Sequence, residues 1–124
     1  MTTTKENAPL IGVVGVCSSG KSTLIAALES YGLRIRHIAQ EHSYVKDMWQ
    51  RLRNPDILIY LHVSYEIAQE RRNLSWTEKE YETQLHRLRH AREHADIRLD
   101  TDNKSPAQVT QETINFLREI GVVA

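Results

Sequence analysis

The densest chemistry in this sequence lies in residues 15–22, which read GVCSSGKS. Gly15 and Gly20 permit backbone angles that a side chain would forbid, so successive N–H groups can turn into one small nest. Lys21 adds a mobile positive charge, and Ser22 supplies a hydroxyl that can ligate Mg²⁺. Together these residues complete the pattern G-x-x-x-x-G-K-[ST], which predicts a loop that holds the phosphates of a nucleoside triphosphate.

Such a loop requires a buried strand before it and a helix after it, and the sequence predicts both. Residues 9–16, PLIGVVGV, form a short continuous apolar run that is typical of a strand buried on both faces. Residues 21–30 follow with helical spacing, and Gly32 supplies a stop. The start of that helix adds unpaired N–H groups and the positive end of its dipole. This context argues against a chance match in a glycine-containing turn.

The rest of the chain alternates between strand and helix signals. Period-two alternation and two arginines favour an edge strand over residues 33–39, whereas ILIYLHV (57–63) has the composition of a buried strand. The other expected elements are a short helix over 46–53, a helix after Ser64, a helix from the capping box Thr77/Glu80 to about Ala95, a strand over 97–100, and a last helix from Ser105-Pro106 to Gly121.

The resulting order, β-α-β-α-β-α-α-β-α, predicts an α/β fold. We expect a mostly parallel sheet of about four strands, covered by helices on both faces. Residues 1–124 form one expected domain, in which residues 1–8 are polar and frayed.

Charge and cysteine content narrow the classes of partner and setting. Sixteen basic residues balance sixteen acidic ones, so we expect no DNA or RNA partner. The apolar runs are far shorter than the roughly 20 residues of a membrane helix, and the N-terminus lacks a signal-peptide core. The single cysteine, Cys17, excludes an internal disulfide and a zinc site built from cysteines, and it indicates a reducing, cytoplasmic setting.

A second acidic residue usually helps to hold the metal at a phosphate-transferring site. Ligands of an open parallel sheet lie beyond the carboxyl ends of its strands, and Glu41 follows the second strand, whereas Asp56 precedes its strand. The strand ILIYLHV ends at His62 and Ser64 without a carboxylate. Glu41 is therefore the candidate to hold Mg²⁺ or to orient an acceptor. The alternative is an exposed and inert glutamate after an edge strand.

Arginines are further candidates, because phosphoryl transfer spreads charge over several oxygens. Arg71 and Arg72 end one predicted helix, and Arg92 falls within the apolar stripe of the next. A cation on an apolar face needs either an anion or a stem long enough to reach water. Arg92 therefore either contacts a phosphate or extends past the apolar face to solvent.

Two other features can bind a metal or react. His86, His90 and His94 recur every four residues, a spacing that can hold a transition metal. Their projection opposite the apolar stripe favours a solvated face instead. Cys17 is either a redox-sensitive thiol near a helix N-terminus or a small side chain at a variable loop position, and we favour the second interpretation.

The loop and the order of elements resemble the P-loop kinases of the nucleoside and nucleotide type. PDILIYLHVSYEIAQERR (55–72) is similar to the stretch of thymidylate kinases that carries the fourth strand and leads into the lid. QLHRLRHAREHADIRLDTD (84–102), SPAQV (105–109) and the closing helix resemble the rest of that family's C-terminal half. The chain departs from the family in its short segment between Glu41 and Pro55, and in carrying His62 where an aspartate is expected.

The resemblance implies a three-layer P-loop NTPase fold with a reduced sheet, and ATP with Mg²⁺ as the ligand. It implies a lid arginine at position 71 or 72 and places residues 100–102 close to the base. The residues that it places around the phosphates are Gly15, Ser18, Ser19, Gly20, Lys21, Ser22 and Thr23.

We therefore expect an ATP-binding, kinase-like protein that transfers the γ-phosphoryl group to a small nucleoside- or nucleotide-like acceptor. The expected catalytic residues are Lys21, Glu41, Arg72 and Arg92, and the expected Mg²⁺ ligands are Ser22 and Glu41. The alternatives are a nucleotide-dependent switch or slow NTPase that acts through a protein partner, and a relative that binds nucleotide without catalysis. Three roles stay open for Tyr44, Met48 and Trp49. They line an acceptor pocket, form a homodimer contact or belong to the core.

Overall fold

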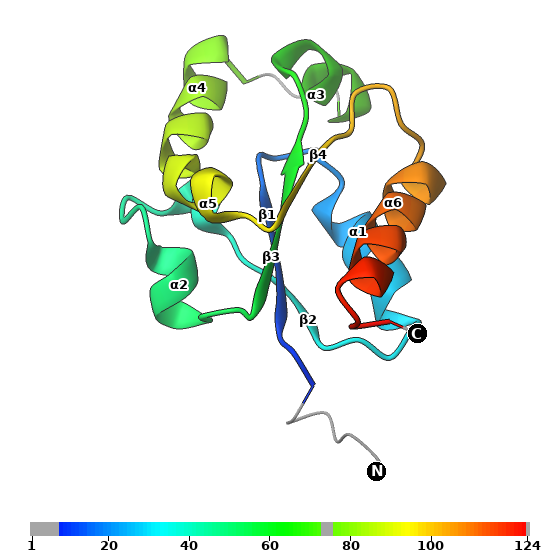
Figure 1. Ribbon diagram of the computed structural model, residues 1–124. Coiled ribbons are helices and arrows are strands. Elements are labelled where there is room, and N and C mark those ends of the chain that lie inside the picture. Colours follow the sequence, from blue (N-terminus) through cyan, green and yellow to red (C-terminus); the bar gives the residue numbers. More distant parts are fainter. Residues whose placement is uncertain (1–7, 73–75, 124) are drawn as a thin grey trace.

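The computed structural model describes residues 8–72 and 76–123, and within them a four-stranded sheet occupies the centre (Figure 1). All its strand pairs are parallel, with Ile11 opposite both Ile35 and Ile57, and Ile59 opposite Ile97. In spatial order the strands are β2 (Ile35–His37), β1 (Ile11–Gly15), β3 (Ile57–His62) and β4 (Ile97–Asp100). The predicted edge strand β2 is at an edge, and the predicted buried strands β1 and β3 are central.

Helices cover both faces of the sheet (Figure 1). Side chains alternate along β3, so that Ile57, Ile59 and Leu61 join one core cluster, and Leu58 and Tyr60 join the other. The first face carries α1 (Lys21–Glu29) and α6 (Pro106–Glu119), and the second carries α2 (Met48–Leu52), α3 (Tyr65–Arg72), α4 (Glu78–Arg87) and α5 (Arg89–His94). This is the predicted three-layer α/β architecture.

Local signals set the start of two helices. Thr77 and Glu80 form the predicted capping box of α4, and Trp76 packs edge-on against Tyr81 with ring centroids 5.7 Å apart. A second capping box, Ser105 with Gln108, begins α6 directly before Pro106.

The helix predicted from Thr77 to Ala95 is not continuous. Leu88 (φ −93°, ψ −3°) separates α4 from α5 and is fully buried. At this break the Gln40 side chain donates from Nε2 to the Arg87 carbonyl at 3.1 Å. Gln40 belongs to the short 3-10 turn η1 (Gln40–His42), which lies far from α4 in sequence. A long-range contact therefore accompanies a break that helical periodicity does not reveal.

Helical spacing predicts the inner face of α6 to be Val109, Thr113, Phe116, Leu117 and Ile120. Val109, Thr113 and Leu117 are buried and Phe116 is partly buried, but Ile114 is buried in place of Ile120, which is 47% exposed. Ile120 lies just beyond α6, where the chain turns, and so leaves the helical face.

No helix in the described ranges is both long and apolar enough to cross a membrane. The fraying predicted for residues 1–8 concerns residues that, apart from Ala8, lie outside those ranges.

Candidate functional site

The turn between β1 and α1 carries the GVCSSGKS loop at the carboxyl ends of the strands. Gly20 has φ 98° and Ser18 has φ 68°, so the loop twice adopts the left-handed conformation. Gly20 therefore has the role that the motif predicts. Gly15 has another, because a Cβ at Gly15 would collide with the Leu61 carbonyl oxygen and lie 2.7 Å from Ser19 Oγ. Close packing, and not a left-handed angle, requires this glycine.

Lys21 folds back onto its own loop. Its Nζ donates to the carbonyls of Gly15 at 2.6 Å and Val16 at 3.0 Å, and it forms an ion pair with Glu41 Oε2 at 3.0 Å. These three acceptors match the three N–H donors of an ammonium group, and Lys21 is 8% exposed. A charged phosphate oxygen is a stronger acceptor than a neutral carbonyl. Lys21 can therefore exchange a loop carbonyl for a phosphate.

Glu41 is buried beside this ammonium group. Its side chain is only 3% exposed, so the expected alternative of an exposed glutamate is wrong. The neighbouring Gln40 holds the turn that carries Glu41, because its Oε1 accepts from the Trp49 amide at 2.8 Å and its Nε2 donates to the carbonyls of Val45 and Arg87. The carboxylate is thus held at a fixed place beside the loop.

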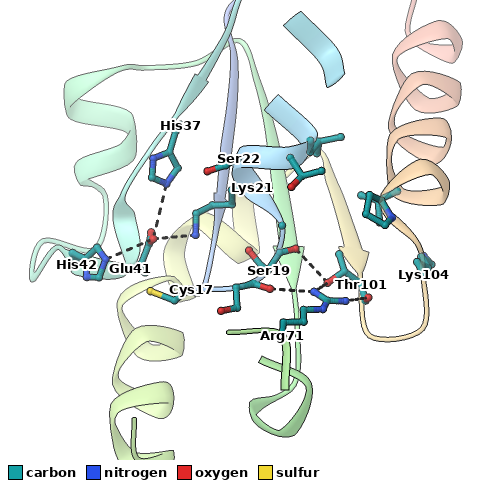
Figure 2. Close-up of a pocket in the computed structure, with 16 residues that line it drawn as sticks. Cys17, Ser19, Lys21, Ser22, His37, Glu41, His42, Arg71, Thr101 and Lys104 are labelled. Atoms are coloured by element: carbon teal, nitrogen blue, oxygen red, sulfur yellow. Dashed lines mark hydrogen bonds and ion pairs between the residues drawn. The ribbon is translucent and has the colours of Figure 1, made fainter. Parts of the chain in front are cut away.

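Two histidines flank the carboxylate (Figure 2). The Nε2 atoms of His37 and His42 lie 4.0 Å and 3.9 Å from Glu41 Oε2. Burial and the positive charge of Lys21 lower the pKa of His37 below its ordinary value of 6.5, against the opposite effect of Glu41. His37 is therefore neutral at neutral pH.

Arg71 joins three segments on the other side of the loop (Figure 2). Its Nη1 donates to the Ser18 carbonyl at 3.1 Å and to Thr101 Oγ1 at 3.0 Å, and its Nη2 donates to the Thr101 carbonyl. Thr101 is buried, and its hydroxyl donates to the His62 carbonyl at 2.9 Å. Thr101 belongs to residues 100–102, which the resemblance to thymidylate kinases placed close to the base. Its place directly after a predicted strand, at the ligand-binding end of the sheet, was a further signal.

A cavity of about 660 Å³ lies over the loop. Three buried oxygens at this site, Ser18 Oγ, Ser19 Oγ and Glu41 Oε1, have no hydrogen-bond partner in the described part of the chain. Because buried polar atoms are normally hydrogen-bonded, these three are suited to a polar ligand. The cavity is lined by Cys17, Ser18, Ser19, Gly20, Lys21, Ser22, Thr23, Leu24, His37, Glu41, His42, Arg71, Thr101, Lys104, Pro106 and Val109.

Most of the predicted site residues meet at this cavity, and Arg92 does not. Six of the seven predicted phosphate contacts line it, and the seventh, Gly15, accepts from the lining residue Lys21 through its carbonyl. Arg92 is exposed on α5 and is not among the lining residues, so the structure does not bring it to the loop. The side chain of Arg72 lies outside the described part of the structure. Among residues 100–102, Thr101 lines the cavity, whereas Asp102 Oδ1 accepts from the Ser64 amide at 2.8 Å.

The solvated face predicted for His86, His90 and His94 is only partly present, because His90 packs against other rings. His90 Nδ1 accepts from Trp49 Nε1 at 3.1 Å, and its ring stacks on that of His94 with centroids 4.1 Å apart. His86 is exposed. Trp49 itself is buried in the core, one of the three roles left open for it, whereas Tyr44 is 89% exposed.

Comparison with known proteins bears on the fold. No protein-family model matches the chain, and no curated protein does. Among solved structures, the chain is similar to thymidylate kinase from Candida albicans, with 14% sequence identity, 93% of each chain covered and a TM-score of 0.64. The predicted P-loop NTPase fold is thereby confirmed. The chain shares the fold of that protein, with four parallel strands in the described part of this chain.

Proposed function

We propose that this protein binds ATP with Mg²⁺ and transfers the γ-phosphoryl group to a small nucleoside- or nucleotide-like acceptor. The observation that carries the proposal is the buried pair of Lys21 and Glu41 at the cavity lined by Ser18 and Ser19. The hydroxyls of these two serines have no hydrogen-bond partner within residues 8–72 and 76–123. A polyphosphate needs many donors in a place with little water, and this loop supplies a cation, hydroxyls and the N–H groups of a helix start. The kinase-like fold supports the transfer reaction.

The position of each side chain suggests its role. Ser22, at the start of α1, and Glu41, through Oε1, are the residues that would hold Mg²⁺, which neutralises phosphate charge when bound. Lys21 exchanges a loop carbonyl for a phosphate oxygen. Arg71, already bonded to the Ser18 carbonyl, holds a further phosphate oxygen. Arg71 therefore takes the lid role that the sequence divided between two neighbouring arginines.

The transfer step balances bonds and protons. An oxygen of the acceptor forms a bond to the γ-phosphorus as the bond from that phosphorus to the bridging oxygen of ADP breaks. The proton of the acceptor hydroxyl passes to His37, which lines the cavity and is neutral at neutral pH. His37 then releases the proton to water.

Calorimetric titration with ATP, GTP and ADP, each with and without Mg²⁺, tests the binding half of the proposal. We expect magnesium-dependent, micromolar binding of ATP. Release of ADP in the presence of nucleosides or nucleotides, compared with release in water alone, tests the transfer half. Failure to bind any of the three nucleotides overturns the proposal.

Two observations favour a second candidate function, a nucleotide-dependent switch or slow NTPase that acts through a protein partner. After the turn η1, which contains Glu41, the five-residue helix α2 is the one element before Pro55, and this leaves a short segment for acceptor binding. The bonds from Lys21 to the carbonyls of Gly15 and Val16 provide one of the two arrangements that a switch requires. Release of ADP that no acceptor increases would favour this second function.

A further inference from the structure

Three lining residues of the same cavity form a cluster of possible metal ligands. Cys17 Sγ, a carboxylate oxygen of Glu41 and a ring nitrogen of His42 all lie within 4.8 Å of one another. Cys17 comes from the phosphate loop, and the other two come from η1, so the fold brings them together from separate segments (Figure 2). A lone cysteine cannot build a zinc site from cysteines, but this arrangement supplies it with two ligands of other types.

The carboxylate in this cluster has bonding capacity that the protein leaves unused. Glu41 Oε2 is paired with Lys21 at 3.0 Å, whereas Glu41 Oε1 is buried and has no partner among the described residues. A buried, charged oxygen without a partner is costly, and a cation is the partner that best offsets that cost.

The sulfur is also held in place for ligation. Gln84 of α4 accepts from the Cys17 amide through Oε1 at 3.0 Å and donates through Nε2 to Cys17 Sγ at 3.2 Å. An N–H group aimed at the sulfur stabilises negative charge there, and the thiolate is the form that binds metals. Gln84 is itself buried, so this support is part of the core.

We propose that Cys17, Glu41 and His42 bind one divalent transition metal of the zinc class. Thiolate, imidazole and carboxylate together are ligands for Zn²⁺ or Co²⁺, whereas Mg²⁺ prefers oxygen ligands. Metal–ligand bonds of about 2.0–2.3 Å in a tetrahedron place the ligand atoms roughly 3.5 Å apart, so a separation of up to 4.8 Å needs only a small closure. His42 is exposed and can supply that movement.

The site would act as an inhibitory lock, and this consequence rests on the proposed function. A metal held by Cys17 and Glu41 ties the phosphate loop to η1. It also engages the carboxylate of Glu41, the group proposed to hold Mg²⁺ with the triphosphate. Zinc and the magnesium complex of ATP should therefore exclude each other.

Titration of the full chain with Co²⁺, followed by absorption spectroscopy, tests the metal site itself. Because Cys17 is the single cysteine in the sequence, thiolate-to-cobalt charge-transfer absorption can come only from this residue. We expect an equimolar complex with this absorption, which Zn²⁺ abolishes by displacing Co²⁺. Cys17→Ser should remove the absorption, and His42→Ala should weaken Co²⁺ binding at least about tenfold. The matched control is His86→Ala, an exposed histidine on α4, which should leave Co²⁺ affinity unchanged.

Other results would overturn the metal site. Binding of Co²⁺ without thiolate absorption, or with the same affinity in Cys17→Ser, would place the metal elsewhere, for instance on the stacked rings of His90 and His94. A chain that binds no Co²⁺ would overturn it as well.

Calorimetry separates this inference from the proposed function. An equimolar amount of Zn²⁺ should weaken binding of the magnesium complex of ATP to the unmodified chain, and His42→Ala should remove this effect. Thiolate–cobalt absorption in a chain that binds no nucleotide would leave the metal site standing and overturn the proposed function. Nucleotide binding that Zn²⁺ does not change, in a chain with that absorption, would overturn the inhibitory lock alone.

Discussion

The two ends of the sheet use polar side chains in different ways. At the amino ends of the strands, Asp56 accepts from the Leu10 amide and Asp96 accepts from the Leu58 amide, each at 2.7 Å. At the carboxyl ends, three buried side-chain oxygens lack such a partner among the residues that the structure describes. An unpartnered buried group costs about 1–3 kcal/mol, so their presence does not serve stability. The amino end completes the backbone hydrogen bonding, and the carboxyl end retains capacity for a ligand.

The largest expected effect is at the carboxyl end, on nucleotide affinity. Lys21→Ala removes the charge that pairs with Glu41 and that a phosphate would contact. The loss of one partner of a buried charged pair costs roughly 2–5 kcal/mol, so ATP affinity should fall at least about thirtyfold in calorimetric titration. Lys79→Ala, which changes an exposed lysine on α4, is the matched control and should leave affinity unchanged. Unchanged ATP affinity in Lys21→Ala would contradict the ligand-binding role assigned to the carboxyl ends of the strands.

The next largest effect is on the free energy of unfolding, where substitutions of Gly15 and Gly20 should differ. Gly15→Ala forces a Cβ against the Leu61 carbonyl and should cost about 1–3 kcal/mol or more, because the backbone cannot yield easily. Gly20→Ala meets no atom within 4 Å and should cost about 1–2 kcal/mol, through its φ of 98° alone. Denaturant unfolding should therefore rank Gly15→Ala as the less stable variant. The reverse order would show that the left-handed angle at Gly20 costs more than the close packing at Gly15.

A substitution at the amino end should separate stability from binding. Asp96→Ala leaves the buried Leu58 amide without its acceptor, and the free energy of unfolding should fall by about 1–2 kcal/mol. Affinity for ATP should not change in the same variant. If affinity falls together with stability, the two ends are coupled and their division of roles is wrong.

The sequence predicted the loop and its supporting elements because their causes are local. The apolar run before Gly15, the helical spacing after Lys21, and the capping boxes at Thr77 and Ser105 each depend on a few neighbouring residues. The same locality explains why the edge position of β2 could be inferred from its own residues.

The contacts that complete the site join residues far apart in sequence, and no local pattern contains them. The turn that buries Glu41 is fixed by a bond from Gln40 to the Arg87 carbonyl, 47 positions later. Arg71 reaches Thr101, 30 positions later. Helical periodicity over residues 77–95 treats that segment as one rod and so misses the break at Leu88. The position expected for Arg92 assumed the same continuous helix.

The smallest expected effect is the pH dependence of stability and of transfer rate that His37 causes at the carboxyl ends of the strands. Its folded pKa lies below 6.5, so the unfolded chain binds more protons than the folded one as pH falls through this range. Stability should therefore be full above pH 6.5 and should decline as the solution becomes more acidic. The transfer rate should decline in the same direction, because protonated His37 cannot accept the acceptor's proton. With a pKa at or below 6.5, the fall in rate between pH 7.5 and pH 6 is at most about fourfold.

His37→Gln keeps a polar side chain at this position but removes the titrating ring. Rates of ADP release measured with a fixed acceptor across this pH range should then become nearly flat, at a lower maximum. His90 provides the contrast, because burial and the nearby His94 also lower its pKa, while it lies on α5 and outside the cavity lining. His90→Gln should change the stability profile and leave the shape of the rate profile unaltered. A rate profile that follows His90 instead would remove His37 from the transfer step, because the acid sensitivity would then belong to the fold and not to the site.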